Sequence, residues 1–211
     1  MSAIRRANPE SRVWKEELSH ISSDAIRNPV TDTSRAEGLF PEYPYEGQEI
    51  LKVEFDYLLD APGDREPTSL NMAFYYRTES ALWILDPGVR DTLTNEVVQE
   101  LRSELVDKLS ILPGVSVSKK GIWKFIQSSR EVRDVVVRHD FQSISWEDID
   151  NLPPDDIVGE KKVLRAELVF EYRNRTIDVI FSDDNLSVST RSDNEYEYII
   201  QKFEASAIYS R

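Results

Sequence analysis

Runs of alternating apolar and polar residues, joined by short polar turns, limit the possible folds of this chain most. Alternation with a period of two is typical of β-strands that have one face in water, and short turns between such runs are typical of hairpins. We therefore predict an α+β fold with two small, hairpin-rich and largely antiparallel sheets, each packed by amphipathic helices. The clearest runs are residues 50–59, 69–77 and 81–86 in the first half and residues 161–172, 175–181 and 186–190 in the second.

One helical pattern is longer than the others and spans residues 91–112. Apolar residues recur there every four positions, opposite a charged side, and such a stripe predicts an amphipathic helix packed against a sheet. The stripe consists of Val97, Leu101, Leu105 and Leu109. Further helices are predicted at residues 9–20, 119–132 and 193–207, short strands at 115–118 and 133–139, and a helical turn that begins at Ser145.

Residues 21–48 show neither a helical nor a strand period. They contain three prolines, two glycines and many short polar residues, a composition typical of an extended segment. The segment also carries Phe40, Tyr43 and Tyr45. Aromatic side chains that are left exposed together mark a contact surface. We therefore predict an extended arm that lies on another protein subunit, with these three side chains as its anchors.

These patterns divide the chain into three parts. Residues 1–48 are expected to hold the N-terminal helix and the extended arm, residues 49–118 a βββ-α domain, and residues 119–211 an α-β-βββ-α domain. The two larger parts share a hairpin-then-helix plan, and Phe-x-Tyr-Arg occurs in both, at Phe74 and at Phe170. Three interpretations account for the repetition: a duplicated module, a chance likeness between half-buried strands, and a binding site built by Tyr76-Arg77 and Tyr172-Arg173.

The composition excludes several classes of protein. The 211 residues include no cysteine, so a disulfide scaffold, Cys-ligated zinc and a thiol nucleophile are excluded. No apolar run approaches the roughly 20 residues that a membrane span needs, and the N-terminus lacks the apolar stretch of a signal peptide. We expect a soluble protein without membrane contact, kept inside a cell or packed into a particle assembled there.

The net charge of −13 and the isoelectric point near 4.7 leave three interpretations open. The chain can be an ordinary acidic protein, a mimic of nucleic-acid charge, or a protein of a salty cytoplasm, where salt screens the repulsion between acidic groups. Arginines are interleaved with the acidic residues along the whole chain. This distribution argues against mimicry, and it also argues against nucleic-acid binding, which favours a basic stripe.

Few residues are candidates for nucleophilic catalysis or phosphate binding. The chain has two histidines, His20 and His139, and no Gly-x-Ser-x-Gly motif. Its seven glycines form no phosphate-binding loop. His139 is followed by Asp140, but a Ser-His-Asp triad needs convergence in space that a sequence does not show. We therefore predict no catalytic residue and no cofactor site.

A metal-dependent nuclease is the enzyme class that the acidic residues suggest most directly. Asp155 precedes Glu160, and such enzymes place an Asp and a Glu-x-Lys on neighbouring strands around a divalent metal. Four residues between them are too few for two strands and a connection. Asp148 and Asp150 are better spaced but fall in the predicted helical turn. The acidic turn at residues 182–185 lacks the alternating ligands of a calcium loop, so we predict no metal site.

The first half of the chain resembles a class of viral proteins. Within residues 9–118, the order of helix, proline-rich arm, strand, hairpin, long helix and short strand is similar to that of the tail-terminator and tail-completion (head-tail connector) proteins of tailed viruses. Residues 119–211 depart from this pattern. The stretches that carry the resemblance are NPVTDTSRAEGLFPEYP, ILKVEFDYLL, LNMAFYYR, ALWIL and TNEVVQELRSELVDKL.

This resemblance implies a non-enzymatic structural protein of the virion, which self-associates in a ring and contacts neighbouring virion proteins. Together with the acidic composition, it implies a virus of a haloarchaeal host. The alternative is an acidic cytoplasmic adaptor or immunity-type protein that binds one protein partner, and a nuclease-like enzyme is the third possibility. The arm distinguishes the first two, because a ring subunit lays it across a neighbour whereas an adaptor keeps it folded on its own sheet.

Overall fold

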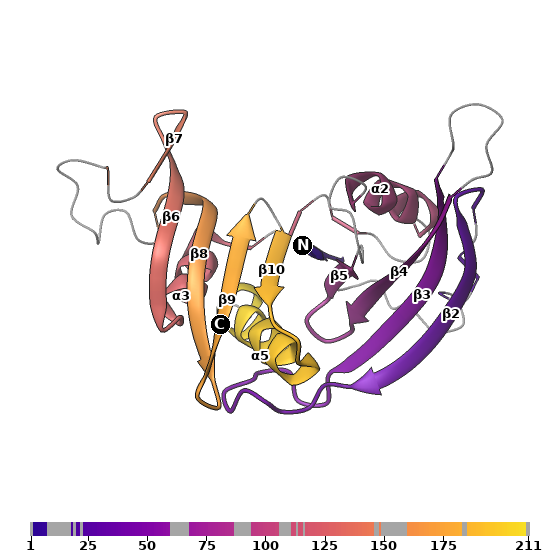
Figure 1. Cartoon of the computed structure of the whole chain (residues 1–211), viewed down its shortest axis with the longest axis horizontal. Coiled ribbons are helices and arrows are strands. Elements are labelled where there is room, and N and C mark those ends of the chain that lie inside the picture. Colours follow the sequence, from indigo (N-terminus) through magenta and orange to yellow (C-terminus); the bar gives the residue numbers. More distant parts are fainter. Residues whose placement is uncertain are drawn as a thin grey trace. The chain divides into compact units, whose positions relative to one another are not determined.

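In the computed structural model the chain forms two compact units (Figure 1), and each unit is described by itself. Unit 1 consists of Met1–Ala36 and Gly47–Val115, and unit 2 consists of Glu37–Glu46 and Ser116–Arg211. The predicted division at residues 48 and 118 stays a prediction. The structure describes residues 2–7, 18, 20–21, 23–59, 68–86, 94–105, 111–112, 114–115, 117–145, 148, 160–182 and 185–209. In this part of the chain, no helix has the length and apolar character that crossing a membrane requires.

The predicted α+β class and antiparallel pairing are confirmed, but the expectation of two sheets is wrong. The ten strands of the described residues belong to one open sheet with the order β2-β3-β4-β5-β1-β10-β9-β8-β6-β7. Hairpin patterns identify strands that are neighbours along the chain. They carry no signal for pairing between strands that are distant in sequence, so the number of sheets could not be predicted from them.

Unit 1 contributes five strands in the order β2-β3-β4-β5-β1, and each neighbouring pair in this order is antiparallel. β3 and β4 pair over ten residues of each strand, from Ile50 opposite Arg77 to Leu59 opposite Thr68. The strands are β1 (Ser2–Arg6), β2 (Ile26–Arg35), β3 (Glu49–Leu59), β4 (Thr68–Arg77) and β5 (Leu82–Asp86).

The predicted long helix packs on these strands, as expected, but it is shorter than predicted. α2 spans Thr94–Glu104, and Ile111, which the prediction placed inside the helix, forms a β-bridge with Ala7. Leu109 lies outside the described residues. The apolar stripe of α2 joins side chains of β3, β4 and β5 in one buried cluster, which includes Val97, Leu101, Leu105, Phe55, Phe74 and Trp83.

Leu101→Ala is expected to destabilise unit 1 by about 2–5 kcal/mol, the usual range for a large-to-small substitution in a core. The Leu101 side chain has no exposed surface, so the substitution leaves a cavity that its neighbours fill only in part. Chemical denaturation measures the change. Glu96→Ala on the exposed side of α2 is the control, and equal effects of the two substitutions would mean that the stripe is not part of the core.

Unit 2 contributes the other five strands, in the order β10-β9-β8-β6-β7, with antiparallel neighbours. The strands are β6 (Glu131–His139), β7 (Gln142–Ser145), β8 (Lys162–Tyr172), β9 (Arg175–Ser182) and β10 (Asn185–Ser189). The helices are α3 (Lys119–Gln127), α5 (Asp193–Phe203) and the π-helical turn η3 (Glu204–Ile208).

Aromatic contacts hold α3 and α5 against the same face of β8 and β9. The Phe125 ring of α3 stacks on Phe170 of β8 with 5.1 Å between ring centroids, and it meets Phe203 of α5 edge-on at 5.2 Å. Phe203 also stacks on Phe181 of β9 at 6.3 Å. Pairs of this kind add about 0.5–1.5 kcal/mol to the burial of their area, so they fix the positions of both helices on the strands.

The predicted extended arm is wrong over residues 26–35, which form β2. Every residue of this strand except Ile26, Pro29 and Thr31 is exposed, so the apolar alternation that marks a half-buried strand is missing. Two further predictions differ from the structure. Residues 115, 117 and 118 are not in a strand, and Ser145 ends β7. The helix predicted at residues 9–20 lies outside the described residues except for positions 18 and 20.

Candidate functional site

The three predicted anchors lie in residues 37–46, a segment that we call the docked segment because it packs on α5 and η3 of unit 2. Phe40 meets Tyr198 of α5 edge-on, with 6.3 Å between ring centroids. Tyr43 meets Tyr45 at 5.7 Å, and Tyr45 meets Tyr209 at 5.7 Å. All three anchors are partly buried against their own chain. Their contact with another subunit stays a prediction.

Gln201 of α5 fixes the backbone of the docked segment. The side-chain carbonyl of Gln201 accepts hydrogen bonds from the backbone N–H groups of Leu39, at 3.1 Å, and Phe40, at 3.0 Å. Its amide group donates to the backbone carbonyl of Glu37 and to Glu197 Oε1. Gln201 has no exposed surface, and these four bonds use the whole hydrogen-bonding capacity of its amide.

A second polar contact lies at the start of η3. The Tyr43 hydroxyl donates to Glu204 Oε2 at 2.7 Å, and Glu204 has no exposed surface. A buried carboxylate is costly without hydrogen-bond donors, so the tyrosine stabilises Glu204 while Glu204 orients the segment. The sequence did not identify Gln201 or Glu204, because both follow apolar residues in the helical pattern and neither belongs to a recognisable motif.

Lys202 lies beside the docked segment, and three aromatic rings surround its ammonium group. Its Nζ atom is 5.3 Å from the Phe40 ring centroid, 5.6 Å from that of Phe170 and 5.7 Å from that of Tyr198, and it donates to the Ser128 carbonyl at 3.1 Å. Burial lowers the pKa of Lys202, and the negative charge of Glu42 opposes this shift. These contacts hold the lysine in place as part of the docking surface.

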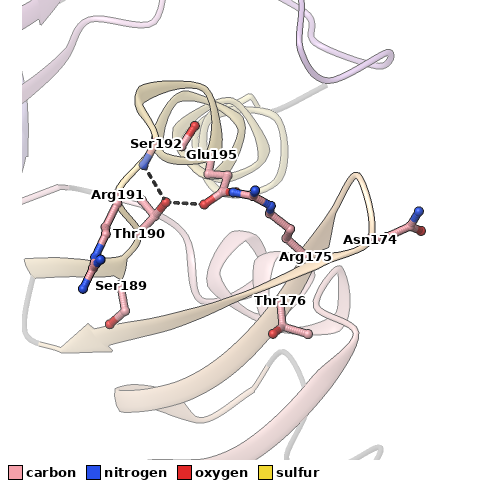
Figure 2. A pocket seen from close by; sticks show the side chains of 8 residues that line it. All are labelled: Asn174, Arg175, Thr176, Ser189, Thr190, Arg191, Ser192 and Glu195. Atoms are coloured by element: carbon pink, nitrogen blue, oxygen red, sulfur yellow. Dashed lines mark hydrogen bonds and ion pairs between the residues drawn. The ribbon is translucent and has the colours of Figure 1, made fainter.

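A cavity in unit 2 has a volume of about 800 Å³ and is lined by polar side chains. Figure 2 shows the Arg175 guanidinium reaching Glu195, with 3.4 Å between Nη1 and Oε1. The Thr190 hydroxyl donates to the other oxygen of Glu195, and Ser192 N–H donates to Thr190 Oγ1 at 3.1 Å. Asn174, Thr176, Ser189 and Arg191 complete the lining.

This cavity offers hydrogen bonds and charge but no pair of nucleophile and base. Glu195 is the one carboxylate in its lining, and it already binds Arg175 and Thr190. Its two carboxylate oxygens are thus both engaged, Oε1 by Arg175 and Oε2 by Thr190. The lining can therefore bind a polar group, and it contains no arrangement that activates a nucleophile.

The residues considered for catalysis or metal binding do not form a site among those that the structure describes. His139 Nε2 is 3.6 Å from Asp140 Oδ2, and its buried Nδ1 atom has no hydrogen-bond partner. His20, Asp148 and Glu160 are exposed, and Asp150 and Asp155 lie outside the described residues. Within the described part of the chain, no group of three or more His, Asp or Glu side chains is placed to hold a metal ion.

The other candidate surface is the outer edge of β2, the first strand in the order of the sheet. The pairing of β2 with β3 shifts in register between Arg27 and Val30, where Asn28 adopts a positive φ of 52°. From Val30 to Arg35 the register is regular. Val30 is 62% exposed, a large value for an apolar side chain in a strand. This six-residue stretch (30–35) of β2 is called the regular edge below.

The backbone of the regular edge has an outward side. Ala36 N–H donates to the Gln48 carbonyl of the neighbouring strand at 2.9 Å, so Ala36 faces β3. Successive residues of an antiparallel strand point their backbone groups in opposite directions. The N–H and carbonyl groups of Thr31, Thr33 and Arg35 therefore point away from β3. In the described part of the sheet, no strand lies on that side of β2.

Asp32 protects the middle of this edge. Its carboxylate accepts a hydrogen bond from the Thr33 N–H at 2.8 Å, which occupies one of the outward donors. Asp32 is also paired with Lys52 in the ladder between β2 and β3. A hydrogen bond with Glu54 raises the pKa of Lys52, and the charge of Asp32 contributes to this shift. Charged residues on an edge strand usually limit uncontrolled pairing.

Comparison of the chain with models of protein families and with curated proteins gives no match.

Proposed function

We propose that this chain is a non-enzymatic protein that works by binding another protein chain through the outer edge of β2. The observation that carries the proposal is the outward row of backbone groups at Thr31, Thr33 and Arg35 on an outermost strand. A strand edge of this kind can accept an additional strand, whose main-chain hydrogen bonds supply affinity. The bulge at Asn28 and Pro29 limits the surface to the regular edge.

Between the two kinds of binding protein considered above, the docked segment favours an adaptor. A ring subunit was expected to lay Phe40, Tyr43 and Tyr45 across a neighbour. Their packing on Tyr198, Glu204 and Tyr209 of the same chain instead agrees with an adaptor that keeps this segment folded. A subunit of a viral tail-completion ring is the second candidate, favoured by the order of elements within residues 9–118.

A photo-crosslinking amino acid at position 33 tests the proposal. When the full chain is expressed in its own host, we expect a specific protein adduct from position 33 and none from position 173, which is exposed in the β8–β9 turn. Arg35→Pro is expected to abolish the adduct, because proline removes an outward N–H while the inward bonds to β3 remain. Arg35→Ala is the matched control, and it keeps the N–H.

The mass of the adduct separates the candidates. Linkage to a different protein supports an adaptor, and a series of linked copies that closes at a fixed number supports a ring. If positions 33 and 173 give the same adducts, or if Arg35→Pro changes nothing, β2 is not a binding surface and the proposal is wrong. Thermal unfolding of the Arg35→Pro variant, compared with Arg35→Ala, checks that the fold is intact.

A further inference from the structure

We infer that β2 also pairs with β2 of a second copy of this chain, antiparallel and about a two-fold axis through Thr33. The inference rests on the proposed function, because it names one partner for the same edge. Its basis is that the regular edge is complementary to itself. In this register Thr33 lies opposite Thr33 of the second copy, and Thr31 lies opposite Arg35 of the second copy.

The spacing of the outward backbone groups selects this register. Two edge strands pair only when residues with outward groups are opposite each other, and the register about Thr33 uses all three such residues of each copy. A shift of two residues toward the bulge would place Arg35 opposite Pro29, which has no N–H to donate. The register about Thr33 therefore forms more inter-strand hydrogen bonds than the register shifted toward the bulge.

The side chains are compatible with the same register. Thr33 meets Thr33, a cross-strand pair that stabilises antiparallel strands. Asp32 lies opposite Ser34, and Arg35 lies opposite Thr31, so no two like charges are directly opposite. A register about Asp32 would instead bring the two Asp32 carboxylates face to face, and like charges in that position are destabilising.

Charge makes this pairing dependent on salt. In the register about Thr33, the Asp32 side chains of the two copies are diagonal neighbours, about 7–8 Å apart by general strand geometry, and each lies beside its own Lys52. The chain as a whole carries a net charge of −13. The repulsion between the two Asp32 carboxylates and the repulsion between the net charges of the two copies are both screened within roughly 3 Å at 1 M salt. The dimer is therefore expected to form more readily in molar KCl than at low salt.

The pairing is also expected to be weak and limited to two copies. A six-residue edge (30–35) buries far less than the about 800 Å² per partner of a stable interface. A contact in which each copy uses the same surface closes at a dimer. Sedimentation of the full chain should therefore show a mass that rises with concentration from 24.4 kDa toward twice that value, and not beyond.

Single cysteine variants test the register without interference, because the chain has no cysteine of its own. In the paired state, the two cysteines of the Thr33→Cys variant would face each other with about 5.5 Å between Cα atoms, within the range of a disulfide. The cysteines of the Asp32→Cys variant would be only diagonal neighbours, which is too far for a disulfide. Under mild oxidation in molar KCl, we expect Thr33→Cys to link at least about ten times faster than Asp32→Cys, as expected for a preformed contact.

Three other outcomes would overturn the inference. Faster linkage of Asp32→Cys would mean a different register, equal rates would mean random collisions, and no linkage of either variant would mean no pairing. If these outcomes occur while the photo-crosslinker at position 33 still gives an adduct that Arg35→Pro abolishes, the self-pairing is wrong and the proposed function stands. If that adduct is also missing, both the self-pairing and the proposed function are wrong.

A variant that is expected to dimerise more strongly gives an independent check. Asp32→Ala removes the carboxylate that accepts the Thr33 N–H and removes the diagonal repulsion. We expect the dissociation constant of the dimer at low salt to fall at least several-fold in this variant, measured by sedimentation equilibrium. Thr31→Ala, which keeps the backbone and the charge, is the matched control, and an equal or weaker association of Asp32→Ala would contradict the register.

Discussion

Deletion of residues 1–46 is expected to leave unit 1 without cooperative structure. The deleted segment contains β1 and β2, two of the five strands of this unit. It also removes Leu18, Ile21 and Ile26 from the core, where each is at most 2% exposed. Burial of one such side chain contributes about 1.5–3 kcal/mol. The free energy lost with three buried side chains is comparable with the roughly 5–15 kcal/mol that stabilises a whole domain.

Amide hydrogen exchange in β3 and β4 measures this effect. In the full chain these central strands are expected to exchange slowly, since strands in a core open only with the whole unit. In the truncated chain their protection should be lost. The triple substitution of Phe40, Tyr43 and Tyr45 by alanine is the control, because these residues belong to unit 2 and β3 should stay protected. A truncated chain with a slow-exchanging β3 would contradict the expected role of β1 and β2.

The sequence alone supports the opposite expectation, because it predicts that residues 1–48 form a helix and an arm outside the two larger domains. The reversal follows from two strands that the hydrophobic pattern does not mark. β1 has only five residues, and Ala3, Ile4 and Arg5 are buried in succession, so it shows no alternation. β2 is mostly exposed and contains Pro29 at its bulge. An edge strand that is exposed to solvent on both faces has the composition of a loop.

Most of the other strands and the helices were predictable because the apolar residues of each face the core of its unit, whereas β7 has no buried residue and was not predicted. Phe74 and Phe170, the two repeated positions of the sequence, are both buried, each in the core of its own unit. Their shared arginine behaves differently, since Arg77 is buried whereas Arg173 is exposed in a turn at a positive φ of 49°. The repetition is therefore better explained by the apolar residues that a hairpin places in a core than by a repeated binding site.

The candidate site was predictable only in part. Phe40, Tyr43 and Tyr45 were identified as contact residues, since aromatic side chains among prolines need a surface to cover them. The surface itself could not be predicted, because residues 37–46 and α5 are more than 140 positions apart in the sequence and no local pattern links them. Gln201, which connects the two, is recognisable only from its four hydrogen-bond partners.

Gln201→Ala is expected to release the docked segment from α5. The substitution removes all four hydrogen bonds of the amide, each with a net contribution of about 0.5–1.5 kcal/mol. The free energy of unfolding of unit 2 should therefore fall by about 2–6 kcal/mol. Gln127→Ala is the matched control, because Gln127 is exposed at the end of α3 and its loss should change stability by at most about 0.5 kcal/mol.

The amides of Leu39 and Phe40 give the most direct measurement, since both donate to Gln201. In the parent chain these two N–H groups should exchange slowly, and in the Gln201→Ala variant they should exchange at nearly the rate of an unprotected loop while β8 stays protected. Fast exchange in the parent chain would mean that the docked segment is free in solution. Phe40, Tyr43 and Tyr45 would then be available to a neighbouring subunit, and the ring would replace the adaptor as the better explanation.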